Sequence, residues 1–110
     1  MKRILITLSL IAIVTCAGTI LGAGDAKAGK EVFTKKCSTC HGQQGEGKET
    51  IAKQLKVELK HLGSAEVQAK TDDQIKKIIL EGDGKMKPVK EMDAKAIEDV
   101  TAFVRTLKKK

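Results

Sequence analysis

Two cysteines and a histidine near residue 40 are the residues in this sequence best suited to chemistry. They lie in the pentapeptide Cys37-Ser38-Thr39-Cys40-His41. Residues three apart on a helix lie on one face, so the two thiols can reach the two vinyl groups on one edge of a porphyrin and form thioethers. The imidazole that follows can then take an axial position on the iron. This C-x-x-C-H spacing is typical of the attachment site of a c-type haem.

Three other uses of the cysteine pair fit the sequence less well. A thioredoxin-like redox pair is expected in a βαβ unit, whereas the residues around this motif have a helical pattern. A zinc site made by the motif with His41 and His61 would have adjacent residues as ligands and one distant histidine, which matches no usual zinc spacing. A disulfide across two residues would close a tight, strained loop. Haem attachment is therefore the interpretation that we adopt.

A haem that carries electrons also needs a ligand opposite His41, and the sequence offers three candidates. Met86 lies in a loop rich in glycine and lysine, and Pro88 restricts the chain just after it. Met92 stands just before the last predicted helix, where packing is the better explanation. His61 would give a bis-histidine haem, but it lies beside a stripe of leucines. We rank Met86 first, His61 second and Met92 third.

Residues 1–23 have the pattern of a secretory signal. Two basic residues precede an apolar stretch at residues 4–14, and small residues follow. We expect cleavage between residues 23 and 28 and export to the bacterial periplasm. An uncleaved segment would instead anchor the protein in a membrane, because apolar character persists to Leu21. A lipid anchor through Cys16 is a weaker alternative, because the residues before it fit a lipobox poorly.

Residues 24–110 are predicted to form one domain that depends on its cofactor. This part has 87 residues, and the chain has two Phe but no Trp or Tyr, so the apolar core is small. A buried porphyrin would supply the missing apolar volume. The two cysteines of this part both lie in the motif, so haem attachment would use them as thioethers in place of a disulfide.

The chain is strongly basic, with a formal net charge of +7. Most lysines are expected to solvate the surface, but a positive face would also steer an acidic partner. Nucleic acid is not expected as a partner, because export is predicted, a binding motif is lacking and the chain has no Trp or Tyr for base stacking. Acidic residues show no cluster that indicates a catalytic pair, so we do not expect an enzyme.

The spacing of apolar residues and caps predicts an all-α fold. No segment shows the alternation of a strand. Four helices are expected: one over residues 27–40, one over 49–62, one that begins at the capping box Thr71-Asp72-Asp73-Gln74 and ends at Gly82, and one that is capped by Asp93 and extends to Leu107.

With these elements in place, nearly all of residues 24–110 resembles a small class I cytochrome c. Gly29 and Phe33 stand where that family has a glycine and an aromatic residue that contact its last helix, and Phe103 stands at the aromatic position of that last helix. The segment around Met86, GKMKP, resembles the loop of the methionine ligand. The resemblance implies a small helical fold wrapped around one covalently bound haem c, with His41 and Met86 as its iron ligands.

The sequence departs from the family pattern around the haem. Lys87 separates Met86 from Pro88, whereas the family often has the two joined directly. Many members have a prolyl carbonyl that accepts the proton of the axial histidine, but Pro88 is the one proline here, so this acceptor has no counterpart. No Trp or Tyr is available to bind a haem propionate.

These observations predict an exported, monomeric one-electron carrier whose iron alternates between Fe(II) and Fe(III). A thioether ligand favours Fe(II) and raises the potential relative to a bis-histidine haem. Its partners are expected to be redox proteins with acidic docking surfaces. The alternatives are a haem sensor or peroxidase-like enzyme with a displaceable methionine, and a cytochrome subunit of an exported dehydrogenase or oxidase.

Overall fold

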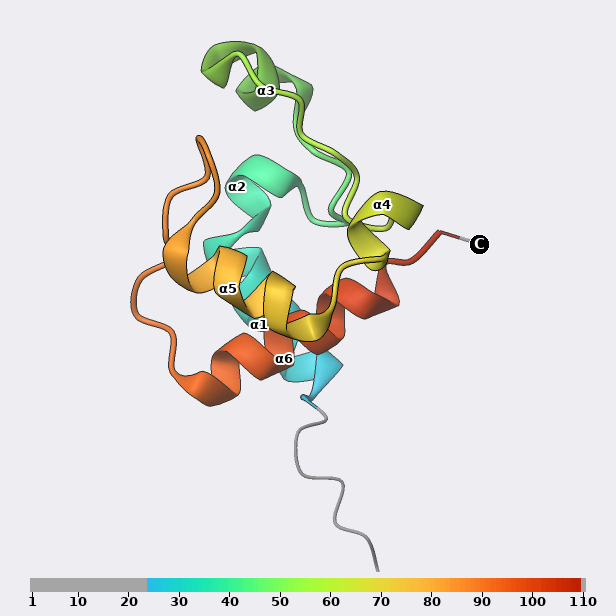
Figure 1. The fold of residues 1–110 in the computed structure, drawn as a ribbon, viewed down its shortest axis with the longest axis vertical. Helices are drawn as coiled ribbons and strands as arrows, with labels where there is room; N and C mark the ends of the chain where they lie inside the picture. The colour runs from blue at the N-terminus through green and yellow to red at the C-terminus, as the bar shows by residue number, and fades with distance from the viewer. Residues whose placement is uncertain (1–23, 110) are drawn as a thin grey trace, which may run out of the picture.

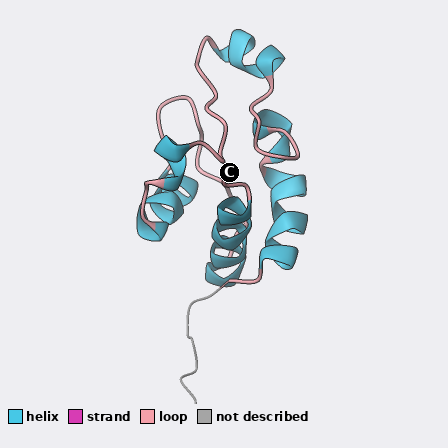
Figure 2. Cartoon of the chain, turned by 90° about the vertical axis from the view of Figure 1, so that its right-hand side faces the viewer, coloured by secondary structure: helices cyan, strands magenta, loops and turns pink. Residues whose placement is uncertain are grey.

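The computed structural model describes residues 24–109, and helices make up its regular structure (Figures 1 and 2). In chain order they are α1 (Ala26–Lys36), α2 (Ser38–His41), α3 (Glu49–Leu55), α4 (Ala65–Gln68), α5 (Asp72–Glu81) and α6 (Ala94–Thr106). Within residues 24–109 there is no strand, and an isolated bridge pairs Asp83 with Met86. The all-α prediction is confirmed. The predicted signal, residues 1–23, lies outside the described residues.

The central contact of the fold joins α1 to α6, the pair of described helices that packs most extensively. The rings of Phe33 and Phe103 meet here, with centroids 5.0 Å apart and planes tilted by 54°. Tilted pairs at this distance are a favourable arrangement of aromatic rings. Phe33 and Val100 are buried almost completely. The contact between first and last helix that the family resemblance implied is therefore confirmed.

Gly29 allows the backbones of α1 and α6 to approach each other. A Cβ atom at Gly29 would overlap the carbonyl group of Asp99, and one at Gly24 would overlap the carbonyl group of Glu98. Backbone cannot move aside as a flexible side chain can, so these glycines are required by the close approach. The packing of α1 against α6 therefore depends on the lack of a side chain at Gly29 as much as on the contact between the two Phe rings.

A buried carboxylate fastens the start of α1 to α6. Asp99 accepts hydrogen bonds from the Asp25 backbone N–H and from the Lys95 ammonium group, each over 2.8 Å. The hydrogen bond from Lys95 and then that from Asp25 lower the pKa of Asp99, which keeps it ionised at neutral pH. Asp25 in turn caps α1 by accepting from the N–H groups of Lys27 and Ala28.

The caps of the last two helices lie where the sequence predicted them. Thr71 and Gln74 form a reciprocal capping box at the start of α5, and Gly82 ends that helix with a φ of 79°. The Asp93 side chain accepts from the Ala96 N–H over 2.7 Å at the start of α6. The predicted boundaries of both helices are confirmed to within a residue.

The two earlier helix predictions need correction. The helix predicted over 27–40 is broken at Cys37, which ends α1 and begins α2 with a φ of −118°. The helix predicted over 49–62 is wrong beyond Leu55, because Lys56 adopts the left-handed conformation and ends α3. The chain then returns extended to Leu62, whose N–H donates to the Gly45 carbonyl over 2.8 Å.

Helix α3 lies apart from the other helices, at the tip of an excursion that both views show (Figures 1 and 2). The base of the excursion is attached to the haem motif: the Gly47 N–H donates to the His41 carbonyl over 2.7 Å, and the Lys48 N–H donates to the Cys40 carbonyl over 2.9 Å. Helix α4, which the sequence analysis did not predict, follows the excursion and is capped by Ser64. Among the described helices, none is long and apolar enough to cross a membrane.

We predict that Gly29→Ala destabilises the haem-loaded protein by about 1–3 kcal/mol, because the new methyl group must push α1 away from α6. Denaturant unfolding followed by circular dichroism measures this loss. Glu31→Ala, an exposed position on the same helix, is the matched control and should unfold close to wild type. Equal stability of Gly29→Ala and wild type would contradict the close approach.

Candidate functional site

A cavity opens at the centre of the fold, against the α1–α6 contact. Its empty volume, including the part open to solvent, is about 650 Å³, which is in the range of sites for organic ligands. Its walls are apolar except for one histidine and one lysine. The lining residues are Phe33, Cys37, His41, Leu62, Val67, Lys70, Ile75, Ile78, Ile79, Met86, Val100 and Val104.

Three of the four predicted site residues line this cavity. Cys37 comes from the junction of α1 and α2, His41 from the end of α2, and Met86 from the loop between α5 and α6. The fourth, Cys40, lies in α2 and is half-buried, but it is not among the lining residues. Cys37 and Cys40 are in no disulfide within the described chain, so both thiols are available for thioethers.

A tight turn presents Met86 to the cavity. The backbones of Asp83 and Met86 exchange two hydrogen bonds of 2.9 Å, which close the turn. Gly82 precedes the turn with a positive φ, and a Cβ atom there would meet the Met86 carbonyl oxygen at 2.5 Å. The Val89 N–H then donates to the Ile79 carbonyl over 2.9 Å and returns the chain to α5. The methionine is thus held by backbone geometry at the end of α5.

His41 is buried in a way that favours the neutral imidazole. Its Nδ1 atom is buried and has no hydrogen-bond partner among the described residues. Burial lowers the pKa of His41, and the neutral ring is the form that binds a metal. A buried polar atom without a partner is unusual in a native protein. The sequence suggested no acceptor for the proton of this histidine, and no described residue supplies one.

The surroundings of Cys37 do not suit a reactive dithiol. Burial raises the pKa of the Cys37 thiol to about 11, and the nearby Lys36 charge only partly opposes this. Redox-active cysteine pairs have a lowered thiol pKa, so the thioredoxin-like interpretation loses support. Within residues 24–109, no three His, Cys, Asp or Glu side chains lie close enough together to hold a metal ion, which disfavours the zinc interpretation.

The two lower-ranked iron ligands lie outside the cavity lining. The His61 Nδ1 atom accepts a hydrogen bond of 2.8 Å from the Gly63 N–H. Met92 is partly buried against the hydrophobic core. Neither side chain is among the residues that line the cavity, whereas Met86 is. This placement supports the ranking, and the choice of Met86 stays a prediction that a spectrum must test.

The residues that sequence reasoning missed form the wall between α3 and α5. The sequence pattern places Leu62 in a predicted helix and indicates no role for Val67 or Lys70, yet all three line the cavity. The available signal was weak: Ser64 can cap a short helix, and Lys70 directly precedes the capping box of α5. Neither feature indicates by itself that the segment faces a ligand.

The residues present fit a covalently bound haem. Cys37 and Cys40 would hold it when each thiol S–H adds across a vinyl group, His41 and Met86 would ligate its iron, and the apolar walls would exclude water. An all-α domain with this motif and this cavity defines a small c-type cytochrome. The family model described as "Cytochrome C oxidase, cbb3-type, subunit III" matches residues 24–104, and the chain belongs to this family of c-type cytochromes. Membership implies haem c and its iron.

Two solved structures share the fold. The KustC0563 c-type cytochrome is 30% identical, with a TM-score of 0.62, and the match covers 74% of this chain and 98% of that one. Cytochrome cL from Hyphomicrobium denitrificans is 26% identical, with a TM-score of 0.61, and the match covers 81% of this chain and 51% of that one. This chain therefore matches about half the length of cytochrome cL. A comparison with curated protein sequences gave no match.

We predict that the haem is covalently attached through Cys37 and Cys40. The intact mass should exceed that of the polypeptide by one haem, and extraction with acidified acetone should leave the haem on the protein. Cys37→Ala and Cys40→Ala should each lower the yield of haem-loaded protein, whereas Cys16→Ala, which removes the remaining cysteine, should still give covalent haem. Haem that leaves the wild-type protein in the solvent phase would refute attachment.

Proposed function

We propose that the protein is an exported monohaem cytochrome that carries single electrons between redox partners. The observation that carries this proposal is the shared cavity: His41 from α2 and Met86 from the α5–α6 loop both line it. A histidine and a methionine are the axial pair of electron-transferring cytochromes c. The bound haem supplies the Fe(II)/Fe(III) couple, and the polypeptide sets its potential, its access to water and its docking.

The cavity is better suited to electron transfer than to enzymatic chemistry. Among the described residues that line it, none is an aspartate or glutamate, and the one histidine is the proposed iron ligand. A peroxidase-like enzyme needs an open coordination site and a group that moves protons near it. With Met86 bound to the iron, the coordination site would be closed, and the described lining residues include no carboxylate that could move protons. The sensor and peroxidase-like alternatives therefore rank below the carrier.

The proposed location is the bacterial periplasm, with residues 24–110 as the mature, monomeric domain. Support comes from the sequence: basic residues, an apolar stretch and small residues follow one another in the first 23 positions. Retention of this segment would make a membrane-anchored form of the same cytochrome.

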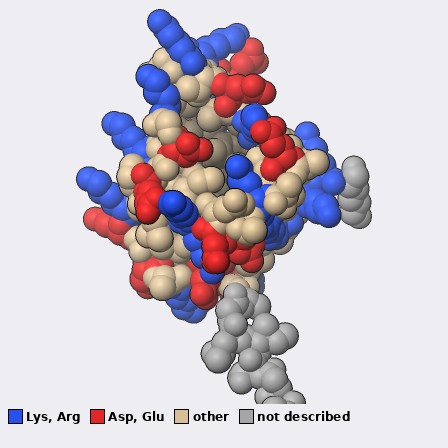
Figure 3. Space-filling model, viewed as in Figure 1, with Lys and Arg blue, Asp and Glu red and all other residues tan. Residues whose placement is uncertain are grey.

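Lysines around the haem motif and the methionine loop form the proposed docking surface. Lys35, Lys85 and Lys87 are exposed and have no ion pair within the described chain. Lys36 is less available to contact a partner protein, because its ammonium donates to the Lys90 carbonyl over 3.2 Å and lies 4.0 Å from the Glu91 carboxylate. Figure 3 shows basic side chains over the visible face and at the α3 end at its top, with acidic side chains interspersed among them. Such a surface suits an acidic partner.

A second candidate role is that of a cytochrome subunit in an exported oxidase or dehydrogenase. The description of the matching family, which names an oxidase subunit, favours this candidate. It uses the same site and the same electron transfer, so co-purification with a stable partner distinguishes it from a free carrier.

We predict that Met86 is the second iron ligand. The oxidised protein should then show the weak near-infrared charge-transfer band of methionine-ligated Fe(III) haem. Met86→Ala should abolish this band and admit carbon monoxide or cyanide. Met86→His should lower the reduction potential, because imidazole stabilises Fe(III); axial ligands span about 0.8 V across haem proteins.

Met92→Ala and His61→Ala are the matched controls and should keep the near-infrared band. A Met86→Ala spectrum like that of wild type, with loss of the band in either control, would overturn the ligand assignment. Rapid binding of carbon monoxide by the wild-type protein would favour the sensor or enzyme over the carrier.

We also predict that electron transfer to a small acidic redox protein slows as salt is added, since the Debye length falls to about 8 Å near 0.15 M. Stopped-flow kinetics over a range of ionic strength measures this. Lys85→Gln and Lys87→Gln should weaken the salt dependence more than Lys30→Gln, an exposed position on α1. A rate that is independent of ionic strength would remove the lysine docking surface.

A further inference from the structure

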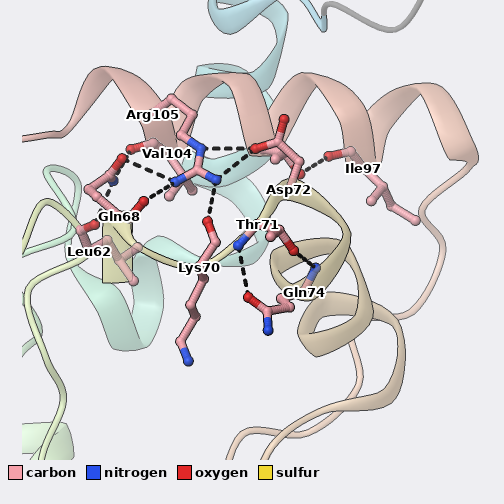
Figure 4. Close-up of polar contacts among 10 residues, drawn as sticks. Leu62, Gln68, Lys70, Thr71, Asp72, Gln74, Ile97, Val104 and Arg105 are labelled. Atoms are coloured by element: carbon pink, nitrogen blue, oxygen red, sulfur yellow. Dashed lines mark hydrogen bonds and ion pairs between the residues drawn. The ribbon is translucent and has the colours of Figure 1, made fainter. Parts of the chain in front are cut away.

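A cluster of hydrogen bonds around Arg105 holds one wall of the cavity to α6 (Figure 4). The Arg105 guanidinium donates to Asp72 Oδ1 from Nε over 2.9 Å, to the Gln68 carbonyl from Nη1 over 2.9 Å and to the Lys70 carbonyl from Nη2 over 2.6 Å. The Gln68 amide donates to the carbonyls of Leu62 and Val104 over 2.9 and 3.0 Å. These bonds hold Gln68, at the end of α4, through its side chain and its backbone carbonyl, and they hold Lys70 through its backbone carbonyl.

Every N–H donor of the Arg105 guanidinium has a partner. Its guanidinium has five N–H donors. Two further contacts, to Gln68 Oε1 over 3.4 Å and from Nη2 to Asp72 Oδ1 over 2.8 Å, occupy the remaining donors. Its charge is matched by the Asp72 carboxylate. Arg105 therefore positions the α4–α5 segment and has no donor left for a ligand in the cavity.

Lys70 is in the opposite situation. Arg105 holds its backbone carbonyl, and Figure 4 shows its side chain pointing away from the guanidinium. Lys70 is exposed overall and also lines the cavity, where it is the one lysine among the described lining residues. No carboxylate in the described chain is within ion-pair distance of its ammonium. The nearby Glu66 is paired with Lys60 instead.

A haem presents a complementary charge. Its vinyl groups and its two propionates lie on different edges of the ring. Cys37 and Cys40 would hold the vinyl edge beside α2, and Figure 1 shows the α4–α5 segment on the other side of the centre of the molecule from α2. A propionate carboxylate at the solvent-exposed edge of an apolar cavity is stabilised by a cationic partner there. The sequence has no Trp or Tyr that could donate to it.

We infer that Lys70 pairs with a haem propionate and that Arg105 positions Lys70 for this contact. The inference rests on haem attachment at the motif and does not depend on the carrier role. A lysine that only covers apolar surface with its aliphatic stem would leave its ammonium in water, away from the propionate. The pairing places a positive charge beside the porphyrin, which disfavours Fe(III) relative to Fe(II).

The test compares Lys70→Gln, Lys70→Arg and Lys30→Gln in the haem-loaded protein. Lys30→Gln removes the same charge from an exposed position on α1 that does not line the cavity. Lys70→Gln should move the reduction potential to a more negative value than Lys30→Gln does, and should shift the propionate bending mode in the resonance Raman spectrum. Lys70→Arg should keep the wild-type mode.

The role of Arg105 is tested by Arg105→Lys and by the milder Asp72→Asn, which removes the carboxylate partner and leaves the guanidinium in place. Both should shift the propionate mode even though Lys70 is present. A wild-type mode in Lys70→Gln, together with a potential equal to that of Lys30→Gln, would overturn the pairing. A wild-type mode in both Arg105→Lys and Asp72→Asn would overturn the positioning role.

Protein mass and the near-infrared band are recorded for each variant. They show whether covalent haem and its methionine ligand are retained, so failure of the proposed haem site is distinguished from failure of the Lys70 contact.

Discussion

The close approach of α1 and α6 is the constraint on which the site depends. Gly29 brings the two backbones together, and the tilted pair of Phe33 and Phe103 fills the space beside it. Phe33 and Val100 belong both to this contact and to the cavity wall. Cys37 directly follows the last residue of α1, so the orientation of that helix also decides where the haem motif lies. Fold and site are therefore built from the same residues.

Helix α6 organises the molecule without contributing a ligand. In the middle of α6, buried Asp99 holds the beginning of α1 through the Asp25 N–H. Near its end, Arg105 holds the segment between α4 and α5. Both are charged groups whose hydrogen bonds reach backbone atoms far away in sequence, and such bonds are stronger than neutral ones. In a domain with a small apolar core, these two links fix elements that packing alone would leave loose.

The sequence could predict those parts of the fold whose signals are local. The capping box at Thr71 and the cap at Asp93 each involve a few consecutive residues, and both helices begin where expected. The end of α3 could not be predicted in this way. Leu55 and Leu59 continue a helical stripe, but Lys56 takes the left-handed conformation because Leu62 must return to the Gly45 carbonyl and the cavity wall. That requirement comes from tertiary structure and overrides helix propensity.

Met86 and Lys70 also differ in whether a local sequence signal or only the tertiary structure identifies them. Met86 was recognisable because a methionine is unusual in a loop of glycines and lysines, and the turn at Asp83 presents it to the cavity. Lys70 is one of many lysines, and only the contact of Arg105 with its carbonyl shows that its position is specified. The proposed sulfur ligand and the proposed lysine would act in the same direction, because each favours Fe(II). The potential of this cytochrome would then depend on one residue that the sequence identifies and on one that only the fold does.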